Sequence, residues 1–122
     1  ANVAGEGRLE PGPSTHWSRT NYNDGHSPPS PVGIDPGGAS PYGVHDMAGN
    51  VWEWVSDWYA EDTYSTGPTR NPKGPKNGDR YAIRGGSFGA ALVYMRASSR
   101  DSDPPEQDGD HIGFRCARSS AP

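Results

Sequence analysis

Large apolar side chains gather in the middle of this chain, where three of its four tryptophans lie close together. At the two-residue period of a strand, Trp52 and Trp54 point to one face while Val51 and Glu53 point to the other. The tryptophan face can bury two large rings, each with about 150–250 Å² of surface. The pattern therefore predicts a strand within residues 42–59 that anchors the core.

Two further segments have strand patterns. Residues 80–84 alternate polar and apolar side chains, which is typical of a short half-buried strand, and residues 112–117 predict a closing strand. The polar segment 101–111 precedes the closing strand and is expected to be an exposed loop. The pair Gly85-Gly86 favours a bulge or close backbone packing over a phosphate cradle, because no Lys-Ser/Thr follows it.

Residues 1–41 are predicted to form a loop-rich lead-in. They contain few large apolar side chains. Runs such as Glu10-Pro11-Gly12-Pro13 have no helical period, and their prolines lack the backbone N–H groups that a regular helix or sheet needs. A lead-in of this length needs something besides apolar burial to order it, and a bound ion would serve. Asp24 lies in a turn signal and is either an ion ligand or an Asx-turn residue.

The composition agrees with sparse regular structure. Seventeen glycines and thirteen prolines occur in 122 residues, and the mean hydropathy is −0.93. Such values approach those of low-complexity chains. Four Trp, six Tyr and two Phe argue instead for a small aromatic core wrapped in irregular loop.

Charge and length narrow the function classes. The net charge is −4 and no basic stripe is present, so nucleic acid is not an expected partner. No apolar run approaches the length of about 18 residues that a membrane span needs. The chain starts at Ala1 without a signal-peptide pattern, which fits a mature secreted chain, a proteolytic fragment or the ordered part of something longer. One cysteine, Cys116, excludes an internal disulfide.

An acid between two indoles suggests a cation site. Glu53 points away from the tryptophan face, and it can join Asp46 and the carbonyls of residues 48–50 in a nest of oxygen ligands for a hard cation. The alternative is that Asp46 caps the turn and Glu53 is solvated. Arg96 and Arg100 are expected to make internal fork-shaped hydrogen bonds. The acids of residues 101–110 lack the order of an EF-hand loop.

Four separated motifs together resemble one family. They are GVHDMAGNVWEW at residues 43–54, DWY at 57–59, RGGSF at 84–88 and GFRCAR at 113–118. In this order and spacing they resemble the formylglycine-generating enzyme, or sulfatase-modifying factor, family. The similarity covers essentially the whole chain but only the C-terminal half of the family's usual domain. The resemblance implies an α+β, C-type-lectin-like fold that is irregular and loop-rich, with short antiparallel strands and little helix.

The resemblance also implies two structural calcium sites. The first falls on Asn2, Val3, Asp24 and His26, and the second on Asp46, Gly49, Val51 and Glu53. Each ion ties a proline-rich loop to the core and supplies ordering free energy that apolar burial does not. Residues 1–122 are thus expected to be a single domain, with residues 1–41 as a calcium-tethered lead-in and residues 42–118 as the core.

Catalysis is where the sequence departs from the family. Active members use a pair of cysteines, between the Arg-Gly-Gly-Ser motif and the following arginines, to bind copper(I) and activate oxygen. Residues 88–95 contain no cysteine here. Cys116 matches a position of structural use, and Met95 is a lone thioether of the kind that fills core gaps. The prediction is that this protein is not an enzyme and takes no small-molecule substrate.

A non-catalytic binding or assembly module is the expected function. Its 88–111 loop surface would face a protein partner, or a chain that supplies the missing half-domain. Millimolar calcium suits weak loop sites, so the periplasm or the exterior of the cell is the expected location. The predicted contact residues are Phe88, Leu92, Tyr94, Asp101, Asp103, Glu106 and Asp108.

Three alternatives remain open. The 88–111 segment has the length and frame of the diversified region of retroelement-encoded variable receptors, which resemble the same family. A divergent metal-dependent oxidoreductase could be built from histidines, which are His16, His26, His45 and His111. In a lectin-type sugar site, calcium itself would coordinate the ligand.

Overall fold

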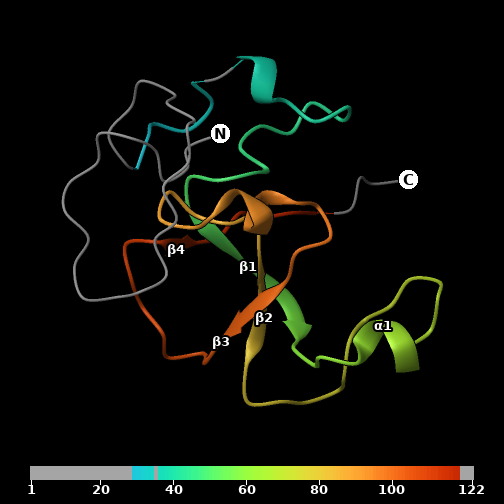
Figure 1. Ribbon diagram of the computed structural model, residues 1–122. Coiled ribbons are helices and arrows are strands. Elements are labelled where there is room, and N and C mark those ends of the chain that lie inside the picture. Colours follow the sequence, from blue (N-terminus) through green and yellow to red (C-terminus); the bar gives the residue numbers. More distant parts are fainter. Residues whose placement is uncertain (1–28, 35, 119–122) are drawn as a thin grey trace.

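The computed structural model describes residues 29–34 and 36–118 (Figure 1). Within these ranges helix is confined to one α-helical turn and two 3₁₀ segments, which confirms the expected loop-rich α+β fold with little helix. The elements in order are η1 (Pro36–Gly38), β1 (Trp52–Trp58), α1 (Thr63–Thr66), β2 (Tyr81–Arg84), η2 (Leu92–Met95), β3 (Asp101–Asp103) and β4 (Ile112–Gly113).

The strands of the described region form one four-stranded sheet in the order β3-β2-β1-β4. The β1–β2 and β2–β3 pairs are antiparallel, as expected, whereas β1 and β4 are parallel. Because β3 and β4 therefore run in the same direction on opposite edges of the sheet, residues 104–111 must return along it. The expectation of antiparallel strands alone is thus wrong for β4.

The tryptophan strand is present but shorter than the 42–59 range in which it was predicted. Trp52 is 7% exposed, and Trp54 packs against the core cluster of Trp52, Ile83 and Ala90. The residues before β1 have positive backbone φ angles, which a strand does not accommodate. These residues are Gly43 (75°), Asp46 (57°), Gly49 (83°) and Asn50 (68°).

The strand predicted over residues 80–84 is confirmed as β2, which carries the buried residues Ala82 and Ile83. The following glycine pair makes a close backbone approach. A Cβ on Gly86 would lie 2.5 Å from the sulfur of Met95 and 3.3 Å from the Tyr94 carbonyl oxygen. Only a residue without a side chain fits there, as the sequence indicated.

The polar segment 101–111 is not wholly an exposed loop. Residues Asp101–Asp103 form the edge strand β3, and Ser102 is buried. Arg80 satisfies the polar groups of this buried residue, because its Nε donates to Ser102 Oγ at 2.9 Å and its Nη2 donates to the Ser102 carbonyl. The closing strand is also shorter than predicted, since it spans only Ile112–Gly113.

Arginine side chains bridge the irregular segments, as expected. Arg96 Nε donates to the Val93 carbonyl at 3.0 Å, and Arg100 Nη2 donates to the carbonyls of Ala60 and Glu61 at 3.0 and 3.2 Å. A guanidinium group has several N–H donors, so it can satisfy backbone carbonyls that are not paired within a helix or sheet. A search of the described residues for a helix long and apolar enough to cross a membrane found none.

Candidate metal centre and binding surfaces

The turn before β1 is fixed by side-chain hydrogen bonds to residues 30–33. Asp46 Oδ2 accepts the N–H of Gly33 at 2.7 Å. Asn50 Oδ1 accepts the N–H of Ser30 at 3.0 Å, and Asn50 Nδ2 donates to the Ser30 carbonyl at 3.2 Å. Asp and Asn tolerate positive φ because their short polar side chains bond locally. These hydrogen bonds tie residues 30–33 to the turn before β1.

The same turn is joined to the glycine-rich segment after β2. The N–H of Gly49 donates to the Gly85 carbonyl at 2.7 Å, and the N–H of Phe88 donates to the Asn50 carbonyl at 2.8 Å. Two of the four resemblance motifs thus meet in space. Their contacts are between backbones, so the glycines matter for close approach more than for chemistry.

Glu53 makes a two-pronged ion pair with Arg115. Arg115 Nε donates to Glu53 Oε2 at 2.5 Å, and Nη2 donates to Oε1. Nη1 and Nη2 also donate to the carbonyls of His45 and Asp46, at 2.8 and 2.9 Å. The hydrogen bond to Glu53 raises the pKa of Arg115, the charges of Glu53 and Asp46 raise it further, and desolvation opposes them. Arg115 therefore fixes the turn to both β1 and the segment after β4.

A cavity of about 410 Å³ lies beside this ion pair. Its lining includes three of the four residues predicted for the second calcium site, which are Asp46, Val51 and Glu53, together with Asn50 and Arg115. The fourth residue, Gly49, is buried and lies outside the lining. Three of the residues grouped by the prediction thus lie at one cavity, together with Asn50 and Arg115, to which the sequence assigned no role, and calcium binding there stays a prediction.

The donor types suit a hard cation, although both carboxylate oxygens of Glu53 already accept from Arg115 in this structure. Two carboxylates and peptide oxygens at one cavity are the ligands that calcium takes in proteins. Arg115 offsets one of the two negative charges, which favours weak over tight binding. No group of three or more His, Cys, Asp or Glu side chains with metal-binding spacing occurs among residues 29–34 and 36–118. The first predicted site, at Asn2, Val3, Asp24 and His26, lies outside those residues, as does His16.

Most of the predicted partner-contact residues are exposed. Leu92 and Tyr94 are 51% and 40% exposed on η2, and Asp101, Glu106 and Asp108 are exposed too. Asp103 is half-buried and pairs with Arg80 at 3.3 Å.

The prediction that Phe88 contacts a partner on this surface is wrong. It is only 3% exposed and lies inside the molecule. It follows directly on the buried pair Gly86-Ser87, and its backbone N–H is bonded to the turn before β1. The segment is thus drawn inward before the chain emerges at η2, so the Phe88 side chain is not available on the loop surface.

Two residues of the 88–95 segment, where the resemblance expects the catalytic cysteines, pack into the core. Ala90 is a member of the core cluster, and Met95 packs against that cluster. This arrangement confirms the interpretation of Met95 as a side chain that fills a core gap. Tyr94 contacts Trp52 edge-on, with ring centroids 6.1 Å apart. Residues 90–95 are thus anchored to β1 by packing.

Known proteins resemble this chain in sequence and in fold. The sulfatase-modifying factor enzyme 1-like domain matches residues 5–120. A formylglycine-generating enzyme of Streptomyces coelicolor is 40% identical over 98 residues, which are 77% of this chain and 30% of that enzyme.

Two solved structures share the fold. PvdO from Pseudomonas aeruginosa has a TM-score of 0.64 and 33% identity, over 75% of this chain and 34% of its own. Treponema denticola variable protein 1 has a TM-score of 0.61 and 30% identity, over 72% of this chain and 31% of its own. The chain thus spans about a third of the length of the proteins it matches.

Proposed function

Since this chain belongs to the sulfatase-modifying factor enzyme 1-like family, we propose that it is a non-catalytic, calcium-stabilised binding or assembly module. The family contains oxidoreductases, so the proposal assigns this chain a different use of the same fold. Fold alone does not determine function, and the argument depends on particular surfaces and side chains.

The apolar surface of η2 carries the proposal. Leu92, Val93 and Tyr94 are consecutive residues that are 51%, 46% and 40% exposed. Adjacent large apolar side chains on a surface mark interaction sites more often than scattered ones do. The acidic residues of the 88–111 surface, Asp101, Glu106 and Asp108, are exposed in the same half of the chain. A protein partner with an apolar patch beside basic groups is complementary to this surface.

The η2 segment is held in place, which suits recognition. Ser99 Oγ and Arg96 Nε both donate to the Val93 carbonyl, at 2.9 and 3.0 Å. Tyr94 is fixed by its edge contact with Trp52. A surface that is ordered before binding loses less conformational entropy on association.

The core packing of residues 88–95 supports a non-catalytic role. According to the family resemblance, oxygen activation needs two thiolates that hold copper(I) in this window. Here the window offers the methyl group of Ala90 and the thioether of Met95, and both pack against the core. The only cysteine, Cys116, is exposed and lies in another segment.

Calcium completes the proposal. Asp46 and Glu53 would hold the ion with the carbonyls of Gly49 and Val51, and the ion would link the turn to β1 by charge neutralisation. A second ion is proposed at Asn2, Val3, Asp24 and His26. Weak sites of this kind fit a periplasmic or extracellular protein, where calcium is abundant. A chain that supplies the remaining part of such a domain is the other partner we propose.

Light scattering after size-exclusion chromatography tests the assembly role. We expect the chain to associate with itself or with a co-purified partner, and a Leu92→Lys/Tyr94→Lys variant to lose that association. A Tyr42→Lys variant is the control, since Tyr42 is 92% exposed and far from η2 in sequence. A wild-type chain that remains a stable 13.0 kDa monomer without any partner would contradict the proposal.

A peptide assay tests the absence of catalysis. The chain is incubated with copper(I), oxygen and a cysteine-containing sulfatase-type peptide, and the product is analysed by mass spectrometry. We expect no formylglycine, while a formylglycine-generating enzyme converts the same peptide. Conversion by this chain above the copper-only background would contradict a non-catalytic role.

A diversified ligand-binding domain is the second candidate. The fold similarity to Treponema denticola variable protein 1 favours it. In the 88–111 segment, Val93, Tyr94 and Asp101 are exposed and could vary without disturbing the core. Sequencing sibling genes from the same source tests it. Differences confined to residues 89–103 support this function, and an even spread of differences contradicts it.

A further inference from the structure

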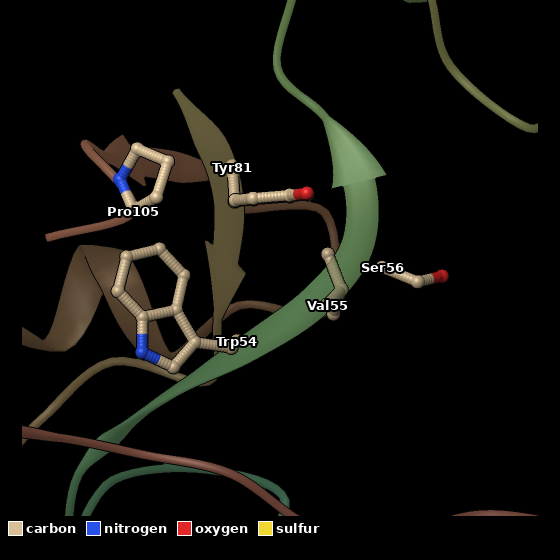
Figure 2. Close-up of a pocket in the computed structure, with 5 residues that line it drawn as sticks. All are labelled: Trp54, Val55, Ser56, Tyr81 and Pro105. Atoms are coloured by element: carbon tan, nitrogen blue, oxygen red, sulfur yellow. The ribbon is translucent and has the colours of Figure 1, made fainter. Parts of the chain in front are cut away.

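An open aromatic pocket of about 490 Å³ lies on the sheet, away from the ion pair described above. It is lined by Trp54, Val55, Ser56, Tyr81 and Pro105. Figure 2 shows the rings of Trp54 and Pro105 next to each other, with the ring of Tyr81 seen edge-on. The planes of the Trp54 and Tyr81 rings meet at 85°, with their centroids 6.4 Å apart. Two aromatic walls at nearly a right angle form the pocket.

Packing behind the pocket holds these walls rigid. Trp58 stacks on Tyr81 at a centroid distance of 3.9 Å and an interplanar angle of 16°. The three rings come from the antiparallel pair β1 and β2, in which Trp58 lies opposite Tyr81. Trp54 also packs against the hydrophobic core. The pocket is therefore preformed, and a ligand does not have to order the rings that it contacts.

The surroundings of the pocket are acidic. Ser56, which lines the pocket, donates through its hydroxyl to Asp57 Oδ1 at 3.5 Å. Glu106 follows Pro105 directly and is exposed. The arginine next to Tyr81, Arg80, is paired with Asp103 at 3.3 Å and bonded to Ser102. Asp57 and Glu106 thus place carboxylates next to the pocket residues Ser56 and Pro105, and carboxylates attract cations.

We propose that this pocket binds an organic ammonium cation of the quaternary or methylated alkylammonium class. The negative faces of aromatic rings attract such a cation, and its methyl groups gain apolar contact with Trp54 and Pro105. Each favourable ring contact strengthens binding by about twofold to thirtyfold. The site uses β1 and β2 and does not depend on the partner surface of η2 proposed above.

Choline and its neutral isostere, 3,3-dimethylbutan-1-ol, test the charge requirement on the full chain. Binding is followed by the NMR shift of the Trp54 indole N–H, which is assigned by its loss in Trp54→Leu. We expect a saturable shift with choline and at least about fivefold weaker binding of the alcohol. Choline binding no tighter than the alcohol, together with no tighter binding of the trimethyllysine probe described below, overturns the proposal.

Charge variants locate the site. Glu106→Lys places a positive charge beside the pocket without changing a buried residue, and it is expected to weaken choline binding at least about threefold. Asp62→Lys is the matched control, since Asp62 is exposed at the start of α1 and makes no side-chain cap bond. Equal weakening in both variants would indicate a net-charge effect and overturn the site. Because Glu106 is exposed, this test stands even if Trp54→Leu fails to fold.

A second pair of ligands identifies the source of the cation. A free solute is represented by choline, and a protein side chain by N-acetyl-trimethyllysine methylamide. Tighter binding of either one than of the neutral alcohol supports an ammonium site and names its source. If neither binds more tightly than the alcohol, the proposal is wrong.

Discussion

Arg115 and Glu53 lie 62 residues apart in the sequence and form a two-pronged ion pair in the fold. The same guanidinium also donates to the carbonyls of His45 and Asp46. One side chain thus joins β1, the turn before it and the segment after β4. Among residues 29–34 and 36–118 few apolar side chains are buried, so such a polar junction substitutes there for part of a hydrophobic core.

Loss of this junction should destabilise the fold. Arg115→Gln removes the charge-assisted bonds to Glu53 and leaves two carbonyls with fewer donors, so we expect the free energy of unfolding to fall by about 1–3 kcal/mol. Urea denaturation followed by tryptophan fluorescence measures it. Arg118→Gln, at an exposed arginine three residues further on, is the control. A loss no larger than that of the control would show that solvent replaces these bonds at no cost.

The contribution of the arginine should not depend on pH in the ordinary range. The pKa of Arg115 is raised in the folded state, so its stabilisation is complete below the unfolded-state pKa and is lost only as pH rises through the folded-state value. Both values lie above the accessible range. Lysine has an unfolded-state pKa of about 10.4, so Arg115→Lys should lose stability relative to wild type as pH rises above about 10.4. Parallel stability curves of the two proteins would contradict this.

Calcium should raise the melting temperature through Asp46. At a free concentration of about 100 times Kd, an ion that binds only the folded state adds about 2.7 kcal/mol. Asp46→Asn removes the charge but retains the acceptor for Gly33 and the tolerance for positive φ, so this variant should respond less. Differential scanning fluorimetry with calcium or with EDTA measures the response, and Asp62→Asn is the control. An identical melting temperature for wild type in both solutions would refute the calcium proposal.

Truncation of Phe88 should mainly reduce stability, whereas truncation of Leu92 should mainly reduce partner binding. Phe88→Ala empties a buried position and should cost about 3–5 kcal/mol. Leu92→Ala trims a side chain that is half exposed and should change stability by no more than about 0.5 kcal/mol, while it weakens partner binding. Chemical denaturation gives both values. A large loss of stability in Leu92→Ala would assign η2 to the core instead of the binding surface.

Several elements followed from the sequence because their information is local. The alternation of Trp52 and Trp54 with Val51 and Glu53 defined the face that the sheet buries. The same period identified the strand at residues 81–84. The strand pattern and the family resemblance grouped Asp46, Val51 and Glu53 as ligands of one cation; these residues line one cavity, and the ion itself stays a prediction.

Only the tertiary structure decided the features that depend on long-range pairing. The Asp-Ser-Asp segment has little strand propensity, and it becomes β3 because β2 offers it an edge and Arg80 bonds Ser102. Neither the parallel pairing of β4 nor the burial of Phe88 follows from any local period.

The same reason explains what was missed at the candidate site. Arg115 was visible in a motif, but its partner is set by how β1 and β4 come together, and its role could not be assigned beforehand. Side-chain periodicity records which face of a segment is buried. Side-chain periodicity does not determine which distant segment covers that face.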